Sequence, residues 1–397
     1  MKRAAIILVV LICMAGLMVF IALRLQIPLA TNSDFQVLYY TTHGLLRGIE
    51  IYDQAAKIEM ISEILKAPLE IDFIPQFAYP PWFALSTFYL GWFSIQSAAV
   101  LWFEINLAML FLSIWFLTEG WKPLFRLLAF PAGLFFYPVL GALAIGQYDF
   151  PVLLGTAMLI YSLRHRQAAL TALGMSLLTF KPHLGGLILV AALIHLILRR
   201  DDLGRRALRY SIVAGVFFFV IGFLASSTWP LAYLTSLLNY RELGHITSCS
   251  ECISLPILLS RWLFDGQLST AAWIALLLFI LFLIVFYLTR SLWHPHELLL
   301  TAVLLVTLLV SPYLYNYDFI LLLVPFAILL YKTSPVEKVS VAVCYIAPSF
   351  ALVYYGRSGN PILIAITGIL LILLYVRAKT LSLTPNGVSH TIQATTE

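Results

Sequence analysis

The stretch Leu268–Thr289, LSTAAWIALLLFILFLIVFYLT, decides the fold class, because it contains no charged side chain. A helix that crosses a bilayer needs about 20 mostly apolar residues. Similar runs recur along the 397-residue chain, which is 61% hydrophobic and only 11% charged. Soluble domains carry about 25% charged residues, and disordered chains are far less apolar. Because the apolar residues form continuous runs and do not alternate, a transmembrane β-barrel is also excluded.

We therefore predict an all-α, polytopic transmembrane helical bundle of about 11–13 helices. It forms a single domain over residues 1–379, followed by a polar tail at 380–397. The run after Lys2-Arg3 is too long for a signal peptide and is interpreted as the first transmembrane helix. The segment 80–94, bounded by Pro80-Pro81, either spans or forms a half-helix. The predicted segments are 4–23, 97–117, 127–145, 147–163, 167–180, 183–198, 208–225, 268–289, 297–311, 318–331, 339–355 and 361–376.

Clusters of Lys and Arg between the runs set the orientation, because such clusters stay in the cytoplasm. All of them face inward if both termini are inside and 80–94 does not cross. Two long loops, 24–79 and 226–267, then lie outside. In the first, apolar residues of 35–46 share one helical face and Gly48 follows, which predicts a helix along the membrane surface. The clusters are Lys2-Arg3, Lys122 to Arg126, Arg164 to Arg166, Arg199 to Arg209, Lys332 to Lys338 and Arg377 to Lys379.

In this topology the unusual polar residues gather on the outer side. Asp34 precedes the helix at 35–46, where it either caps that helix or acts as a general base for a hydroxyl at the membrane edge. Lys181 either snorkels to the headgroups or provides the cation for a lipid-linked phosphate. Arg47 is a second candidate for that phosphate-binding role, with a surface charge as the alternative, and His43 and His183 are weaker polar candidates.

Amide and carboxylate pairs occur at two other helix junctions. Gln147 and Asp149 flank Tyr148, and Asn316 and Asp318 flank Tyr317. Such groups bind sugar hydroxyls in pairs. The alternatives are a helix cap for the first pair and an interfacial aromatic belt around the second.

The two cysteines of Cys249-Ser-Glu-Cys252 are interpreted as a local disulfide or as inert thiols. A metal site with His245 is conceivable but is not predicted.

Several short motifs follow one another along the chain: Asp34-Phe35, Gly44-Leu45-Leu46-Arg47-Gly48 with Tyr52, Tyr79-Pro80-Pro81, Gly146-Gln147, Lys181-Pro182, and Ser311-Pro312 ahead of Asp318. In this order they resemble the GT-C superfamily of integral-membrane glycosyltransferases, and most closely glycosyltransferase family 87. At 316–318, related mannosyltransferases often carry a histidine, where this chain reads Asn316-Tyr317-Asp318.

The resemblance implies transfer of a hexose or pentose, with mannose favoured, from a polyprenyl-phosphate donor to a lipid-linked or cell-envelope glycan, with inversion. It places the catalytic residue at Asp34, with Lys181 and Arg47 at the donor phosphate. His43, Tyr79, Gln147, Asp149, His183, Asn316 and Asp318 are expected to bind substrate. We expect no cofactor, metal or nucleic acid, and a location in the bacterial inner membrane with the site outside. A transporter or flippase, and an oligosaccharide polymerase or ligase, are the alternatives; no internal repeat supports a transporter.

Overall fold

The structure is a computed structural model that describes residues 34–70, 73–242, 252–264, 266–293, 296–312, 314–331 and 334–383. Within these ranges all regular secondary structure is helical, which confirms the all-α fold class. The predicted first transmembrane helix at 4–23 lies outside the described residues. So do Lys2-Arg3, His245, Cys249 and the tail beyond Leu383.

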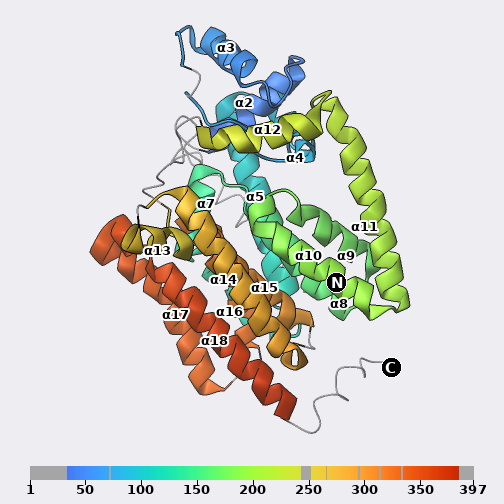
Figure 1. The fold of residues 1–397 in the computed structure, drawn as a ribbon, viewed down its shortest axis with the longest axis vertical. Helices are drawn as coiled ribbons and strands as arrows, with labels where there is room; N and C mark the ends of the chain where they lie inside the picture. Colours follow the sequence, from blue (N-terminus) through green and yellow to red (C-terminus); the bar gives the residue numbers. More distant parts are fainter. Residues whose placement is uncertain are drawn as a thin grey trace.

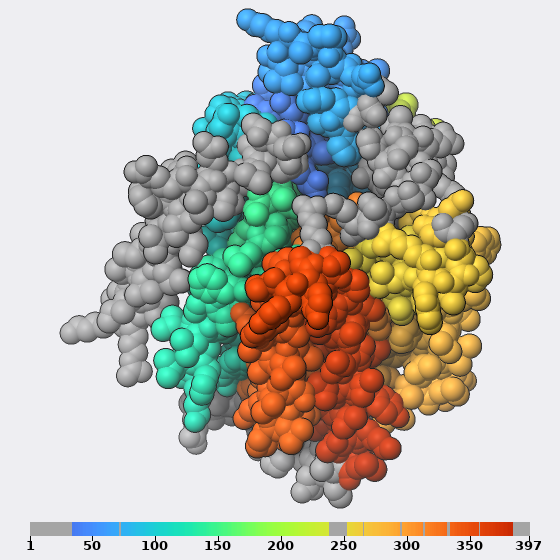
Figure 2. All heavy atoms as spheres, turned by 90° about the vertical axis from the view of Figure 1, so that its left-hand side faces the viewer, coloured from blue at the N-terminus to red at the C-terminus, as the bar shows by residue number. Residues whose placement is uncertain are grey.

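The helices form two groups (Figure 1). We call the first group the head; it consists of α2 (Phe35–Leu46), α3 (Gln54–Leu65), α4 (Pro81–Ser86), η1 (Phe88–Trp92) and α12 (Trp229–Glu242). Figure 2 shows the blue part of the head at one end of the molecule, away from the orange and red C-terminal helices. The second group is the bundle, with α5 (Ile95–Leu117), α6 (Pro123–Leu134), α7 (Tyr137–Ile145), α8 (Phe150–Arg164), α9 (Ala168–Leu178), α10 (Pro182–Arg199), α11 (Asp202–Ile221), α13 (Leu255–Leu263), α14 (Leu268–Leu288), α15 (His296–Val310), α16 (Leu323–Leu330), α17 (Pro335–Tyr355) and α18 (Ile362–Leu383), together with the short 3₁₀ helices η2 (Gly222–Leu224), η3 (Arg290–Leu292), η4 (Asn316–Leu322) and η5 (Gly356–Gly359).

In the described part of the chain, six helices are long and apolar enough to cross a membrane. A seventh candidate span is α6 with α7 at the predicted segment 127–145, and the two helices are bent by 58° relative to each other. Pro138 lies in the first turn of α7 and has no amide proton to continue the α6 hydrogen-bond ladder. Four shorter apolar helices complete the bundle: Phe150–Arg164, Ala168–Leu178, His296–Val310 and Asn316–Leu330. The outward faces of α11 and α14 are apolar and exposed, as expected for surfaces covered by lipid.

The segment 80–94 does not span, because it forms only α4 and η1. This outcome agrees with the arrangement in which all the basic clusters share one side. Two of the described clusters, Arg164 to Arg166 and Arg199 to Arg209, meet at the end of the bundle opposite the head. Arg164 pairs there with Glu297 and lies 3.7 Å from Glu119, and Arg166 pairs with Asp201 at 3.1 Å.

The helix predicted after Asp34 is confirmed as α2, but it is not an exposed surface helix. Most of its residues are buried, and η1, α3, α4 and α5 pack around it. Gly91 of η1 permits the closest approach: a Cβ atom there would lie 2.8 Å from the Thr42 carbonyl oxygen. The α2 helix is therefore the core of the head, and Asp34 is held at its start.

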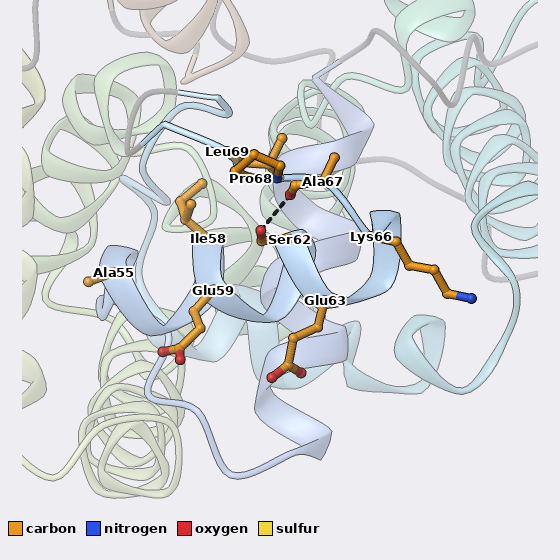
Figure 3. A pocket seen from close by; sticks show the side chains of 9 residues that line it. All are labelled: Ala55, Ile58, Glu59, Ser62, Glu63, Lys66, Ala67, Pro68 and Leu69. Carbon is orange, nitrogen blue, oxygen red and sulfur yellow. Dashed lines mark hydrogen bonds between the residues drawn. The ribbon is translucent and has the colours of Figure 1, made fainter.

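The α3 helix covers α2. Asp53 begins it, accepting a hydrogen bond from the Ala56 amide at 3.0 Å, and this explains Asp53 as a helix cap. After α3 the chain turns back, so that Pro68 and Leu69 lie over Ile58 and an open cavity of about 690 Å³ remains between them (Figure 3).

The second long loop carries α12 and α13, and Cys252 before α13 is disulfide-bonded.

Lys57 is an unexpected buried charge in the head. Its side chain is 2% exposed, and its ammonium reaches Thr41 Oγ1 only at 3.5 Å. Burial lowers the pKa of Lys57 to about 7, and the charge of Asp53 offsets part of that effect. Between about pH 7 and the ordinary value near 10.5, the unfolded chain thus binds more protons at Lys57 than the folded chain.

We therefore predict that the head becomes more stable as the pH rises from 7 to 10. Lys57→Met is expected to raise the melting temperature at pH 7 and to remove most of this pH dependence. The measurement is thermal unfolding of the detergent-purified protein at several pH values, with Lys66→Met, at the exposed residue that follows α3, as the control. An unchanged pH slope in Lys57→Met would contradict the assignment.

Candidate active site

Asp34 lies where α2 begins, but its side chain makes no capping hydrogen bond. Its Oδ2 atom instead accepts hydrogen bonds from Gln147 Nε2 and, at 3.4 Å, from the Tyr317 hydroxyl. The Tyr148 hydroxyl donates to the Asp34 backbone carbonyl. The cap interpretation of Asp34 is therefore wrong. Both side-chain donors bind the same carboxylate oxygen, Oδ2. No described side chain donates a hydrogen bond to Oδ1.

The turn that carries Gln147 is fixed by two residues of α5. Trp102 Nε1 donates to the Gly146 carbonyl at 2.9 Å, and Asn106 Nδ2 donates to the Gln147 carbonyl at 3.1 Å. Gly146 has a φ of +67°, and a Cβ atom there would lie 2.9 Å from the Cβ of Phe35. Only glycine satisfies both requirements, and its close contact with Phe35 brings the turn up to Asp34.

Lys181 does not snorkel to the membrane surface. It is 2% exposed and forms ion pairs with Asp149 and, at 2.7 Å, with Asp318. Asp149 caps nothing, since its side chain makes no bond to the start of α8. Asp318 also accepts from the Tyr315 amide at 2.7 Å. We call Asp149, Lys181 and Asp318 the buried triad; it joins the starts of α8, α10 and η4.

Gln147 connects Asp34 to the buried triad. Its amide nitrogen donates to Asp34, while its Oε1 atom accepts from Lys181 Nζ at 3.4 Å. A carboxylate accepts hydrogen bonds and an ammonium donates them, so the amide can be oriented in only one way. The Lys181 ammonium also lies 5.3 Å from the centre of the Tyr317 ring. Asp34 and Lys181 therefore share two neighbours.

The site places three carboxyl groups, those of Asp34, Asp149 and Asp318, around one ammonium. Burial raises the pKa of Asp34, the charge of Lys181 lowers it, and the charge of Asp318 raises it. One oxygen of Asp149, Oδ2, is buried with no hydrogen-bond partner. In the described ranges, no group of three or more His, Cys, Asp or Glu side chains is placed to hold a metal ion.

The remaining predicted residues divide into two sets. Tyr79 packs edge-on against Tyr148, with ring centres 5.0 Å apart, and so lies next to the Asp34 site. His183 follows Lys181 in the first turn of α10. His43 lies within the head instead, stacked on Tyr39 and within 2.9 Å of the Gly91 carbonyl oxygen. Arg47 is exposed at the end of α2, and no described ion pair joins it to the site.

A second polar network begins beside Tyr317. Asn316 Nδ2 donates to the Tyr137 hydroxyl at 2.7 Å, which in turn donates to Asn360 Oδ1 at 3.1 Å. Sequence reasoning did not single out Tyr137 or Asn360, because each is one polar residue at the edge of an apolar run. It also treated Tyr317 as part of an aromatic belt, although Tyr317 contacts Asp34 directly.

The helices that begin at the site are short. The α8 helix has 15 residues and α10 has 18. At about 1.5 Å per residue, α8 extends roughly 22 Å, less than the roughly 30 Å of a hydrocarbon core, whereas α10 is one of the six helices long enough to cross. Both end at the basic side, at Arg164 and Arg199. An α8 helix with its Arg164 end at one membrane interface therefore places Asp149 below the opposite interface.

The family model of glycosyltransferase family 87 matches residues 77–312, more than half of the chain. The protein therefore belongs to glycosyltransferase family 87 and is an integral-membrane glycosyltransferase, which confirms the family resemblance seen in the motifs. Comparisons with curated proteins and with solved structures found no match. The matched range includes Tyr79, Gln147, Asp149, Lys181 and His183.

The buried triad makes a prediction about Lys181. Lys181→Met leaves two buried carboxylates without their cation, which costs about 3–5 kcal/mol of stability. The triple variant with Asp149→Asn and Asp318→Asn removes all three charges and is expected to recover most of that loss. The measurements are thermal unfolding and yield of monodisperse protein in detergent. If Lys181 were only a phosphate ligand, Lys181→Met would fold normally and lose only donor affinity.

Proposed function

We propose that the protein transfers a sugar, with mannose favoured, from a polyprenyl-phosphate donor to a lipid-linked or cell-envelope glycan, with inversion at the anomeric carbon. The proposed location is the bacterial inner membrane, with the site facing outward. The observation that carries the proposal is the Asp34 carboxylate. It caps no helix, has one oxygen held by Gln147 and Tyr317, and lies near a buried cation.

In the proposed reaction, the acceptor hydroxyl gives its proton to Oδ1 of Asp34. Its oxygen attacks the anomeric carbon from the face opposite the phosphate. The bond between that carbon and the phosphate oxygen breaks, and its electron pair leaves with the polyprenyl phosphate. A raised pKa makes Asp34 a stronger base than an ordinary carboxylate, and the two donors on Oδ2 keep Oδ1 directed to the acceptor.

Lys181 and Arg47 are the proposed cations for the donor phosphate. Three protein oxygens surround the Lys181 ammonium, from Asp149, Asp318 and Gln147. An ammonium has three hydrogens. A direct bond to phosphate therefore requires Lys181 to exchange one of these partners, and otherwise its charge acts through space.

Recognition of the sugar is proposed for the polar groups near Asp34. Gln147, Asp149 and His183 belong to the triad or adjoin it in the chain. Asn316, next to Tyr317, is bonded to Tyr137. Tyr79 provides an aromatic face against Tyr148. The recessed depth of the site supports a membrane-bound donor, because a lipid-linked phosphate enters at that depth without leaving the bilayer.

The donor class is tested by incubating the purified protein with a panel of polyprenyl-phosphate sugars and a membrane glycan extract. We expect release of free polyprenyl phosphate with one of them, polyprenyl-phosphate mannose first, and none with nucleotide sugars. A chain that turns over nucleotide sugars alone would contradict the proposed donor. Release of polyprenyl diphosphate from oligosaccharide donors would indicate a polymerase or ligase instead.

Asp34→Asn tests the general base. The amide oxygen still accepts from Gln147 and Tyr317, but its basicity is lost. We expect a folded protein with unchanged melting temperature and donor affinity, and a turnover lowered about 100-fold or more. Native turnover in Asp34→Asn would remove Asp34 from the mechanism.

Tyr317→Phe is the matched variant for positioning, because it removes one hydrogen bond to Oδ2 and keeps the ring over Lys181. That bond lowers the pKa of Asp34, so its loss is expected to move the acidic limb of kcat/KM to higher pH. If Tyr317 had only a structural role, the acidic limb of the kcat/KM profile would not move in Tyr317→Phe.

A further inference from the structure

We propose that the basic end of the bundle binds one anionic phospholipid headgroup, at a site separate from Asp34. An open cavity of about 500 Å³ lies where α9 and α11 begin and pack against each other. Its only charged lining residues are Arg166 and Arg206, and its walls include Leu170, Leu173 and Tyr210. The α8 helix, roughly 22 Å long, separates it from the Asp34 site.

The two arginines are available to a phosphate. Arg206 is paired with Asp202 one turn earlier, and both side chains are more than half exposed. Arg166 is 58% exposed and shares Asp201 with Arg199, at 3.1 and 2.7 Å. The exposed pair of Arg206 with Asp202 contributes little stability. Asp201 keeps Arg199 and the Gly204 amide when Arg166 leaves it, so a phosphate diester can bind both arginines without a large cost. Guanidinium groups also match the two oxygens of a phosphate.

The surroundings favour an anion. Residues 199 to 209 contain five arginines and two aspartates. A dense basic cluster directly beside a membrane helix is a typical anionic-lipid site. Neither aspartate lines the cavity.

The apolar wall identifies the ligand as a lipid. Leu173 is 52% exposed and Tyr210 is 48% exposed, on helices that face the membrane. A free phosphate would leave this wall uncovered, whereas a phospholipid places its acyl chain along it and its headgroup between the arginines. The cavity therefore combines two charges with one apolar surface, the two chemical features of an anionic phospholipid.

The experiment measures binding of dioleoylphosphatidylglycerol and dioleoylphosphatidylcholine to the full-length protein in detergent by native mass spectrometry. We expect one phosphatidylglycerol to bind at least about 10-fold more tightly than phosphatidylcholine. Arg166→Gln with Arg206→Gln is expected to weaken phosphatidylglycerol binding about 30-fold, since each arginine near an anionic lipid contributes about fivefold.

The matched control is Arg205→Gln with Arg209→Gln. It removes the same number of positive charges, both from α11, and neither residue lines the cavity. It is expected to change binding less than about threefold. An equal loss in both double variants would overturn the site and leave only general attraction to a basic surface. Equal affinity for the two lipids, or displacement of the lipid by millimolar inorganic phosphate, would also overturn it.

Leu173→Gln provides a second test if the arginine variant is unstable. Leu173 is 52% exposed, so we expect Leu173→Gln to fold, and its loss from the apolar wall is expected to weaken phosphatidylglycerol binding severalfold. Unchanged binding would contradict an acyl chain at this wall. Sugar transfer is not the readout in any of these variants, so a failure of the proposed function leaves the test intact.

Discussion

The site depends on the ion pairs of Lys181 with Asp149 and Asp318. Charges buried in a membrane protein are costly unless they are paired, so these three residues must stay together. They come from the starts of three elements, α8, α10 and η4, which lie far apart in the sequence. The ion pairs therefore hold the starts of α8, α10 and η4 next to one another in the bundle. Gln147 then reaches Asp34 from a position that the triad has already set.

The two ends of the bundle hold their charged residues in opposite ways. The basic end is held by exposed pairs such as Arg164 with Glu297, which tolerate water and exchange. The other end buries its charges: Asp149, Lys181 and Asp318 are at most 2% exposed, and Gln147 links them to Asp34 at the start of α2. Because α8 is shorter than a full span, Asp149 lies at a depth that suits the proposed membrane-anchored donor.

Most of the architecture was predictable, because apolar runs and basic clusters are local signals. Each predicted segment within the described ranges corresponds to a helix or a bent pair. The grouping of Asp34, Gln147 and Lys181 was also anticipated from topology. The partners of Lys181 were not, because an ion pair between residues 32 or 137 positions apart leaves no local pattern. Hence Asp149 and Asp318 were predicted only to bind the sugar. His43 and Arg47 were predicted to lie at the site, but no described contact joins them to it.

The charge balance explains why a single lysine is accompanied by two carboxylates. A lone buried ammonium near Asp34 would strongly favour the ionised form of Asp34 and lower its pKa. That would weaken the proposed base while helping the proposed donor phosphate to leave. The charge of Asp318 offsets part of the effect of Lys181 and raises the pKa of Asp34. The proposed base therefore keeps its proton affinity beside a cation. The same offset limits what Lys181 can contribute to the departing phosphate, so stabilisation of the leaving group requires either a rearranged triad or a cation from outside it.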